Sequence, residues 1–91
     1  MLKIDLPRTE ILAQMAEEAA ELSKAALKLR RVLDGKNPTP VTYQDAKDNL
    51  IEELSDIEIC AMALDVRPNQ RTMKEKIERW KKRLEDRNAE T

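Results

Sequence analysis

The sequence predicts an all-α protein, and three observations support this fold class. Aromatic residues make up 2% of the 91 residues and charged residues 38%, a composition that is typical of long amphipathic helices and unfavourable for a β-sheet. Apolar residues recur at helical spacing in three segments, and the single glycine and four prolines lie outside them. A chain of this length forms one domain, here residues 1–91, with a thin core, so we expect oligomers.

The first helix is expected over residues 8–34. Asp5 and Pro7 provide a first-turn signal, and Gly35 suits the left-handed conformation that ends many helices. Residues 35–41 contain two prolines and cannot continue the helix. They are therefore expected to form a loop that lets the second helix fold back antiparallel.

The second helix is expected over residues 43–66, with Thr42 as its N-cap, and the third over residues 69–87, after Pro68 breaks the chain. Thr72 begins another capping-box pattern. The second helix is apolar on more than one face, which favours a central position. The predicted architecture is an antiparallel helical hairpin plus a third helix. Chains of this architecture are expected to assemble into a four-helix-type bundle by oligomerisation.

Each helix of the predicted hairpin has an apolar seam, a row of residues at alternating spacings of four and three. The seam of the first helix contains Ile11, Met15, Leu22, Ala25, Leu29 and Val32, and that of the second contains Ala46, Leu50, Ile57, Cys60 and Leu64. At about 100° per residue, Glu18 and Glu53 fall in line with these seams. Two carboxylates are therefore predicted to lie between the helices.

These glutamates belong to an acidic pattern that occurs twice in matching phase. Residues 17–21 read Glu-Glu-Ala-Ala-Glu, and residues 52–56 read Glu-Glu-Leu-Ser-Asp. Across an antiparallel pair of helices, four carboxylates are expected to face one small volume: Glu18, Glu21, Glu53 and Asp56. Such a group must be protonated, paired with bases or bound to a cation. A cation fits best, because the nearest bases on the same flank lie one to two turns away.

The ligand type indicates which cation would bind. The chain has no histidine, and oxygen ligands suit Mg²⁺ or Mn²⁺ and argue against zinc or a di-iron centre. Mg²⁺ held by a few carboxylates usually keeps positions for phosphate oxygens, so the implied substrate is a phosphate ester or anhydride. The competing interpretation is a solvated acidic helix face, which is common for one such run but less so for two in matching phase.

The paired motifs, Glu18-x-x-Glu21 and Glu53-x-x-Asp56, resemble the signature of the MazG-like all-α nucleoside triphosphate pyrophosphohydrolases. The resemblance covers the first two predicted helices. It implies that the four carboxylates bind Mg²⁺ and that an NTP or dNTP is cleaved to the monophosphate and pyrophosphate, in house-cleaning of nucleotide pools.

The resemblance also makes Glu17 and Glu52 candidate catalytic residues that orient or deprotonate the attacking water. The competing interpretation is that both are surface acids. Related enzymes often contact the base with aromatic residues, and this chain offers only Tyr43 and Trp80, with Trp80 more simply explained as a core residue. The preferred nucleotide is therefore left open.

Charge is distributed unevenly along the chain. Residues 42–65 carry one lysine and seven acidic residues, whereas residues 67–87 carry nine basic and four acidic residues. Lys76, Arg79 and Arg83 share one flank of the third helix and are expected either to contact the substrate phosphates or to form ion pairs with the second helix. The overall net charge of −1 and the absence of a recognisable nucleic-acid-binding motif argue against nucleic-acid binding.

Several features predict a cytoplasmic protein. No apolar run approaches the length of a membrane span, the first residues lack a secretory signal, and a single cysteine excludes an intramolecular disulfide. We expect a homodimer or homotetramer. The alternative to an enzyme is a non-catalytic helical interaction or regulatory module, in which the acidic residues only pair with bases.

Overall fold

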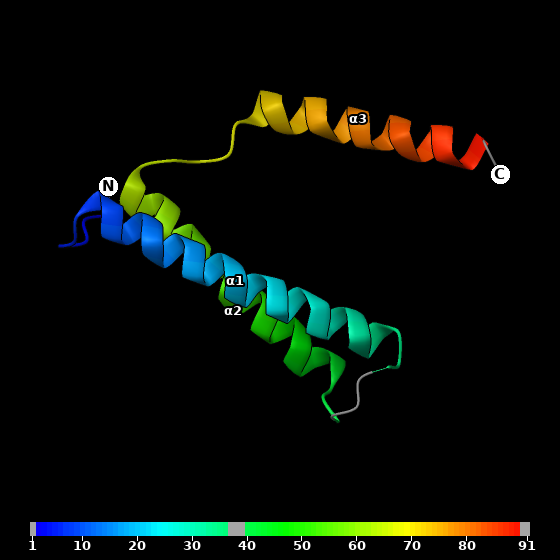
Figure 1. Ribbon diagram of the computed structural model, residues 1–91, viewed down its shortest axis with the longest axis horizontal. Coiled ribbons are helices and arrows are strands. Elements are labelled where there is room, and N and C mark those ends of the chain that lie inside the picture. The colour runs from blue at the N-terminus through cyan, green and yellow to red at the C-terminus, as the bar shows by residue number, and fades with distance from the viewer. Residues whose placement is uncertain (1, 37–39, 90–91) are drawn as a thin grey trace.

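The computed structural model describes residues 2–36 and 40–89, and all regular secondary structure in this part of the chain is helical (Figure 1). Its three helices are α1 (Arg8–Leu33), α2 (Tyr43–Leu64) and α3 (Gln70–Ala89), with no strand among the described residues. The prediction of an all-α fold is confirmed. None of these helices combines the length and apolar character that crossing a membrane requires.

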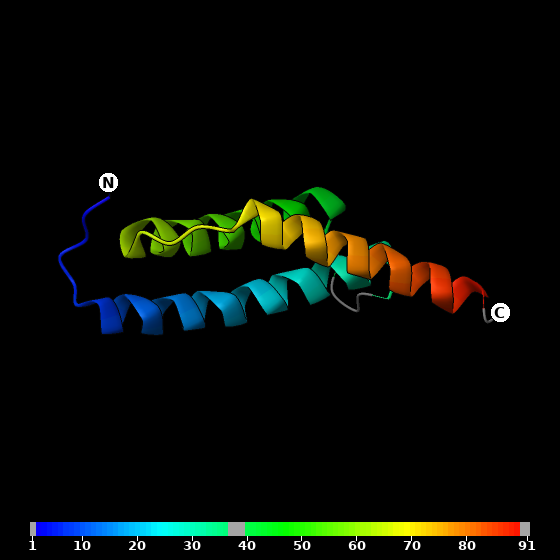
Figure 2. The same cartoon turned by 90° about the horizontal axis from the view of Figure 1, so that it is seen from above.

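Helices α1 and α2 pack side by side as an antiparallel hairpin (Figures 1 and 2). Near the open end of the hairpin, Ile11 of α1 forms a buried cluster with Cys60 and Leu64 of α2, and Met15 and Ala63 pack against it. All of the predicted seam residues are buried or half-buried, as are Glu18 and Glu53. Helical phase alone therefore identified the surfaces that meet.

The first predicted helix end has the expected left-handed glycine. Gly35 has a φ of 68°, and its N–H donates to the carbonyl of Val32 at 3.2 Å. The N–H of Lys36 donates to the carbonyl of Arg31 at 2.9 Å, which completes a Schellman motif. Pro38 of the predicted loop lies outside the described residues.

The second helix ends at Leu64, two residues before the predicted limit of residue 66. Asp65 takes the left-handed conformation with a φ of 57°, and the N–H of Val66 donates to the carbonyl of Ala61 at 3.0 Å. This is a second Schellman motif with a residue other than glycine at its left-handed position. The side chain of Arg8 donates to the carbonyl of Leu64 at 3.1 Å and so joins the start of α1 to the end of α2.

Side-chain caps begin the other two helices. The Oγ1 of Thr42 accepts a hydrogen bond from the N–H of Asp45 at 3.1 Å, as predicted. For α3, the Oδ1 of Asn69 accepts from the N–H of Thr72 at 2.9 Å. The prediction of Thr72 as a cap was wrong, because Asn69 starts the helix earlier and leaves Thr72 inside its first turn. At the other end, α3 continues to Ala89 instead of ending at residue 87.

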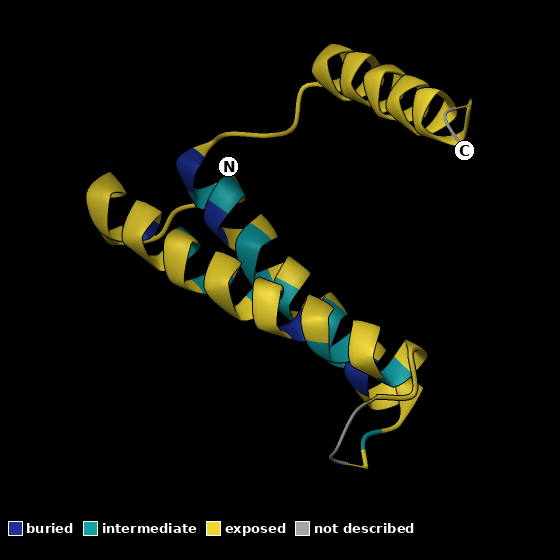
Figure 3. Ribbon diagram, turned by 45° about the vertical axis from the view of Figure 1, so that its right-hand side comes forward, coloured by how far each residue is buried: buried dark blue, intermediate teal, exposed yellow. Residues whose placement is uncertain are grey.

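Helix α3 stands apart from the hairpin (Figure 1). Within the described residues it contacts neither α1 nor α2, and all of its residues are exposed (Figure 3). The buried and half-buried residues of the helices lie instead along the contact between α1 and α2. The core of the chain therefore belongs to the hairpin alone.

Candidate metal centre

Three carboxylates meet across the middle of the hairpin. Glu18 comes from α1 and Glu53 and Asp56 from α2, and each offers an oxygen that lies within 4.8 Å of the other two. All three side chains are half-buried. Their helical phases place them there, since Glu18 and Glu53 lie in the seams and Asp56 lies one turn beyond Glu53 on the adjacent flank.

Apolar contacts continue on both sides of this carboxylate group. The buried cluster of Ile11, Cys60 and Leu64 lies toward the open end, and Ala25 and Ala46, the other buried residues, lie toward the loop end. The carboxylates are therefore held in a seam that is apolar on either side, where the contact between helices limits their access to water. Such a position strengthens the interaction between charges.

Among the described residues, the carboxylate group has a hydrogen-bond donor but no basic partner. The Nε2 of Gln14 donates to the Oε1 of Glu18 at 2.7 Å. The ion pairs formed by the described residues all join side chains three or four positions apart in the sequence, and none includes Glu18, Glu53 or Asp56. Three like charges are thus gathered without a neutralising lysine or arginine.

The electrostatic effect appears at Glu53, the central member. Burial raises the pKa of the Glu53 carboxyl above its ordinary value, and the neighbouring charges of Asp56, Glu18, Glu21 and Glu52 raise it further. Burial also raises the pKa of the Cys60 thiol, with smaller contributions from Glu18 and Asp56. The seam therefore disfavours additional negative charge and favours a proton or a cation.

The fourth predicted ligand, Glu21, lies outside the group of three. It is exposed and accepts a hydrogen bond from the Nζ of Lys24 at 3.3 Å, although its charge still acts on Glu53. The two predicted catalytic residues, Glu17 and Glu52, are exposed on the flanks of their helices. Of these two, Glu52 contributes to the raised pKa of Glu53.

The predicted phosphate-binding residues are not near the carboxylates within one chain. Lys76, Arg79 and Arg83 line a shallow groove on α3 beside Ile77 and Trp80. Because α3 does not contact the hairpin, these bases do not approach the acidic residues of their own chain.

Sequence reasoning overlooked Gln14, whose amide holds one oxygen of Glu18. The signal was available, because residues four apart in a helix are neighbours on its surface and glutamine commonly bonds an acidic residue at that spacing. It also overlooked the closeness of Cys60 to the acidic residues. Cys60 lies four residues after Asp56, on the same side of α2.

The donor set fits a hard divalent cation. Carboxylate oxygens are the ligands that Mg²⁺ and Mn²⁺ prefer, and three of them here converge on one volume without a competing base among the described residues. Comparison of the chain with protein-family models, curated proteins and solved structures found no match. The functional argument therefore depends on the site itself.

Proposed function

We propose that this protein is a Mg²⁺-dependent nucleoside triphosphate pyrophosphohydrolase, with Mn²⁺ as an alternative metal. It would hydrolyse an NTP or dNTP to the monophosphate and pyrophosphate. The observation that carries the proposal is the convergence of Glu18, Glu53 and Asp56 without a basic partner among the described residues. The resemblance of the two acidic motifs to the MazG-like family supports the choice of reaction.

Each residue has a role in this mechanism. Glu18, Glu53 and Asp56 would hold the cation, and the amide of Gln14 fixes the orientation of Glu18 through their hydrogen bond. A divalent cation held there would supply positive charge for the phosphate oxygens and would lower the pKa of a water, the nucleophile for phosphorus. The raised pKa of Glu53 means that protons compete with the cation at this residue, so binding weakens as the pH falls.

The exposed acids have supporting roles in the proposal. Glu21, beside the group of three, would become a fourth metal ligand if its contact with Lys24 were released. Glu17 or Glu52 accepts the proton of the attacking water from the flank of the site. The enzyme would act in the cytoplasm on the nucleotide pool, as a homodimer or homotetramer.

The test of this proposal is an assay of each NTP and dNTP with Mg²⁺, in which pyrophosphate is distinguished from orthophosphate. Glu53→Gln should lower kcat/KM by about 100-fold or more, because it removes a charged ligand. Glu78→Gln is the matched control, since Glu78 is exposed on α3, which does not contact the hairpin, and it should retain activity. Equal activity of the two variants would place the active site elsewhere.

A non-catalytic interaction or regulatory module is the second candidate function. The specific observation in its favour is α3, whose apolar residues are exposed and contact neither helix of the hairpin. This candidate predicts no turnover of any nucleoside triphosphate. Release of pyrophosphate that depends on Glu53 would exclude it as the sole function.

A further inference from the structure

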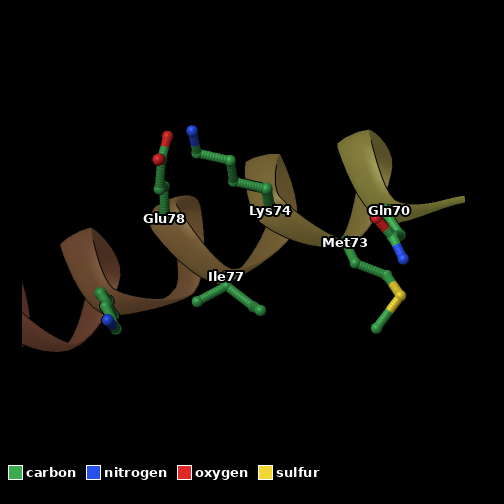
Figure 4. Close-up of a pocket in the computed structure, with 6 residues that line it drawn as sticks. Gln70, Met73, Lys74, Ile77 and Glu78 are labelled. Carbon is green, nitrogen blue, oxygen red and sulfur yellow. The ribbon is translucent and has the colours of Figure 1, made fainter.

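Helix α3 carries an exposed apolar face. Its members follow helical spacing and are between 46% and 62% exposed: Met73, Ile77, Trp80 and Leu84, here called the α3 stripe. Figure 4 shows Met73 and Ile77 pointing to one side of the helix, whereas Lys74 and Glu78 point to the other. A helix with a continuous apolar stripe normally buries it against another surface.

Helix α2 carries a second exposed apolar face, on the side that does not contact α1. Four large side chains there are 49% or 50% exposed: Ile51, Leu54, Ile59 and Met62, here called the α2 outer face. A shallow groove runs along it between Ile51 and Ile59, lined also by Ser55 and Glu58. At about 100° per residue, Met62 points directly away from Glu53, so this face does not compete with the metal centre.

The two faces have complementary charge and length. The segment that contains α2 has a net charge of −6, and the segment that contains α3 has a net charge of +5. Acidic residues such as Glu52 and Glu58 border the α2 outer face, and Lys76 and Lys81 border the α3 stripe. Helices of 22 and 20 residues are about 33 and 30 Å long, so the faces can match along their full length.

The link between the helices carries α3 away from its own hairpin. Residues 66–69 form no helix, Pro68 restricts Arg67 to extended backbone, and α3 then contacts neither α1 nor α2 (Figures 1 and 2). Most of the stability of helices in proteins comes from the packing of an apolar face, and α3 has no packing partner among the described residues of its own chain. The sequence nevertheless gives α3 an N-cap and a regular stripe, which indicates a stable partner.

We propose that this partner is a second copy of the chain: the α3 stripe of each copy docks on the α2 outer face of the other. The exchange is reciprocal, so two equivalent contacts form about a two-fold axis. The proposal does not depend on the proposed function, because neither face includes Glu18, Glu53 or Asp56.

The experiment uses sedimentation and the fluorescence of Trp80, the only tryptophan, over a dilution series of the full chain. We expect a mass twice the 10.5 kDa of one chain, and a red shift of Trp80 emission as dilution releases α3. A 10.5 kDa species with emission that does not change with concentration would overturn the proposal, including the case in which α3 docks on its own hairpin.

Two variants locate the contact. Ile77→Glu in the stripe and Ile51→Lys in the outer face each alter both symmetric contacts, so each should raise the dimer dissociation constant by about 100-fold. Leu27→Glu is the matched control, because Leu27 is equally exposed on the outer side of α1 and belongs to neither face. A dimer that both face variants leave intact, or that Leu27→Glu disrupts equally, would show that copies meet elsewhere.

Discussion

At the residue scale, the central feature is Glu53, a carboxylate placed where its charge is disfavoured. Burial and four acidic neighbours raise its pKa, while its position in the seam is fixed by the periodicity of α2. Sequence phase was sufficient to predict that Glu18 and Glu53 would be half-buried. It also predicted Asp56 beside them, but it did not predict that Glu21 would lie outside the group and contact Lys24, because that choice depends on side-chain rotamers and the register of the helices.

The raised pKa of Glu53 has a consequence for stability without metal. The folded protein holds a proton at Glu53 more tightly than the unfolded chain, so this contribution to stability is present at low pH and is lost as the pH rises through the folded-state pKa. Without metal, Glu53→Gln should therefore melt at a higher temperature than the parent at pH 7, with a smaller difference at pH 4. Circular dichroism during heating measures this, with Glu78→Gln as control; a lower melting temperature for Glu53→Gln at pH 7 would contradict it.

Addition of Mg²⁺ should reverse the order of the two melting temperatures, so that the parent melts above Glu53→Gln at pH 7. A ligand that binds only the folded state stabilises the parent by about 1.4 kcal/mol when it is present at ten times its dissociation constant. Glu53→Gln should lose most of this gain, because one of the three converging carboxylates becomes neutral. The same melting experiment with and without Mg²⁺ provides the measurement. An equal gain in parent and variant would mean that Mg²⁺ binds at another place.

At the element scale, the two helix ends of the hairpin use the same hydrogen-bonding motif with different residues. Gly35 and Asp65 both have a positive φ, but only Gly35 avoids the steric cost of a side chain there. The first helix end could be predicted from its glycine. The second could not, because aspartate gives a much weaker signal and the helical periodicity continues to Val66.

Exchanges at these two positions should act in opposite directions. Gly35→Ala should lower the free energy of unfolding by about 1 kcal/mol, through backbone strain alone, since no atom lies within 4 Å of the added Cβ. Asp65→Gly should raise the same free energy by about 0.5 kcal/mol, and Asp65→Asn controls for the lost charge. Urea denaturation followed by circular dichroism gives these differences. If Asp65→Gly lowered the free energy of unfolding, the stabilisation by the Asp65 side chain would exceed the steric cost of its positive φ.

At the scale of the whole molecule, the chain consists of a packed hairpin and a separate helix. Helical phase predicted the hairpin helices and α3 alike. The spacing of apolar residues in a helix is the same whether the surface that covers them belongs to the same chain or to another. It did not predict that α3 would stand apart, and Trp80, which its spacing assigned to a core, is 62% exposed. Periodicity identifies an apolar face but carries no information about what covers that face.

The buried position of Cys60 allows transient opening of the hairpin to be measured through the reactivity of its thiol. Its thiol is buried between the helices, close to the carboxylates, so an alkylating reagent can reach it only when the seam separates transiently. The alkylation rate would then measure the frequency of that local opening. A cation that bridges the two helices should slow this alkylation. Cation binding can therefore be followed through the alkylation rate of the single cysteine, without any added label.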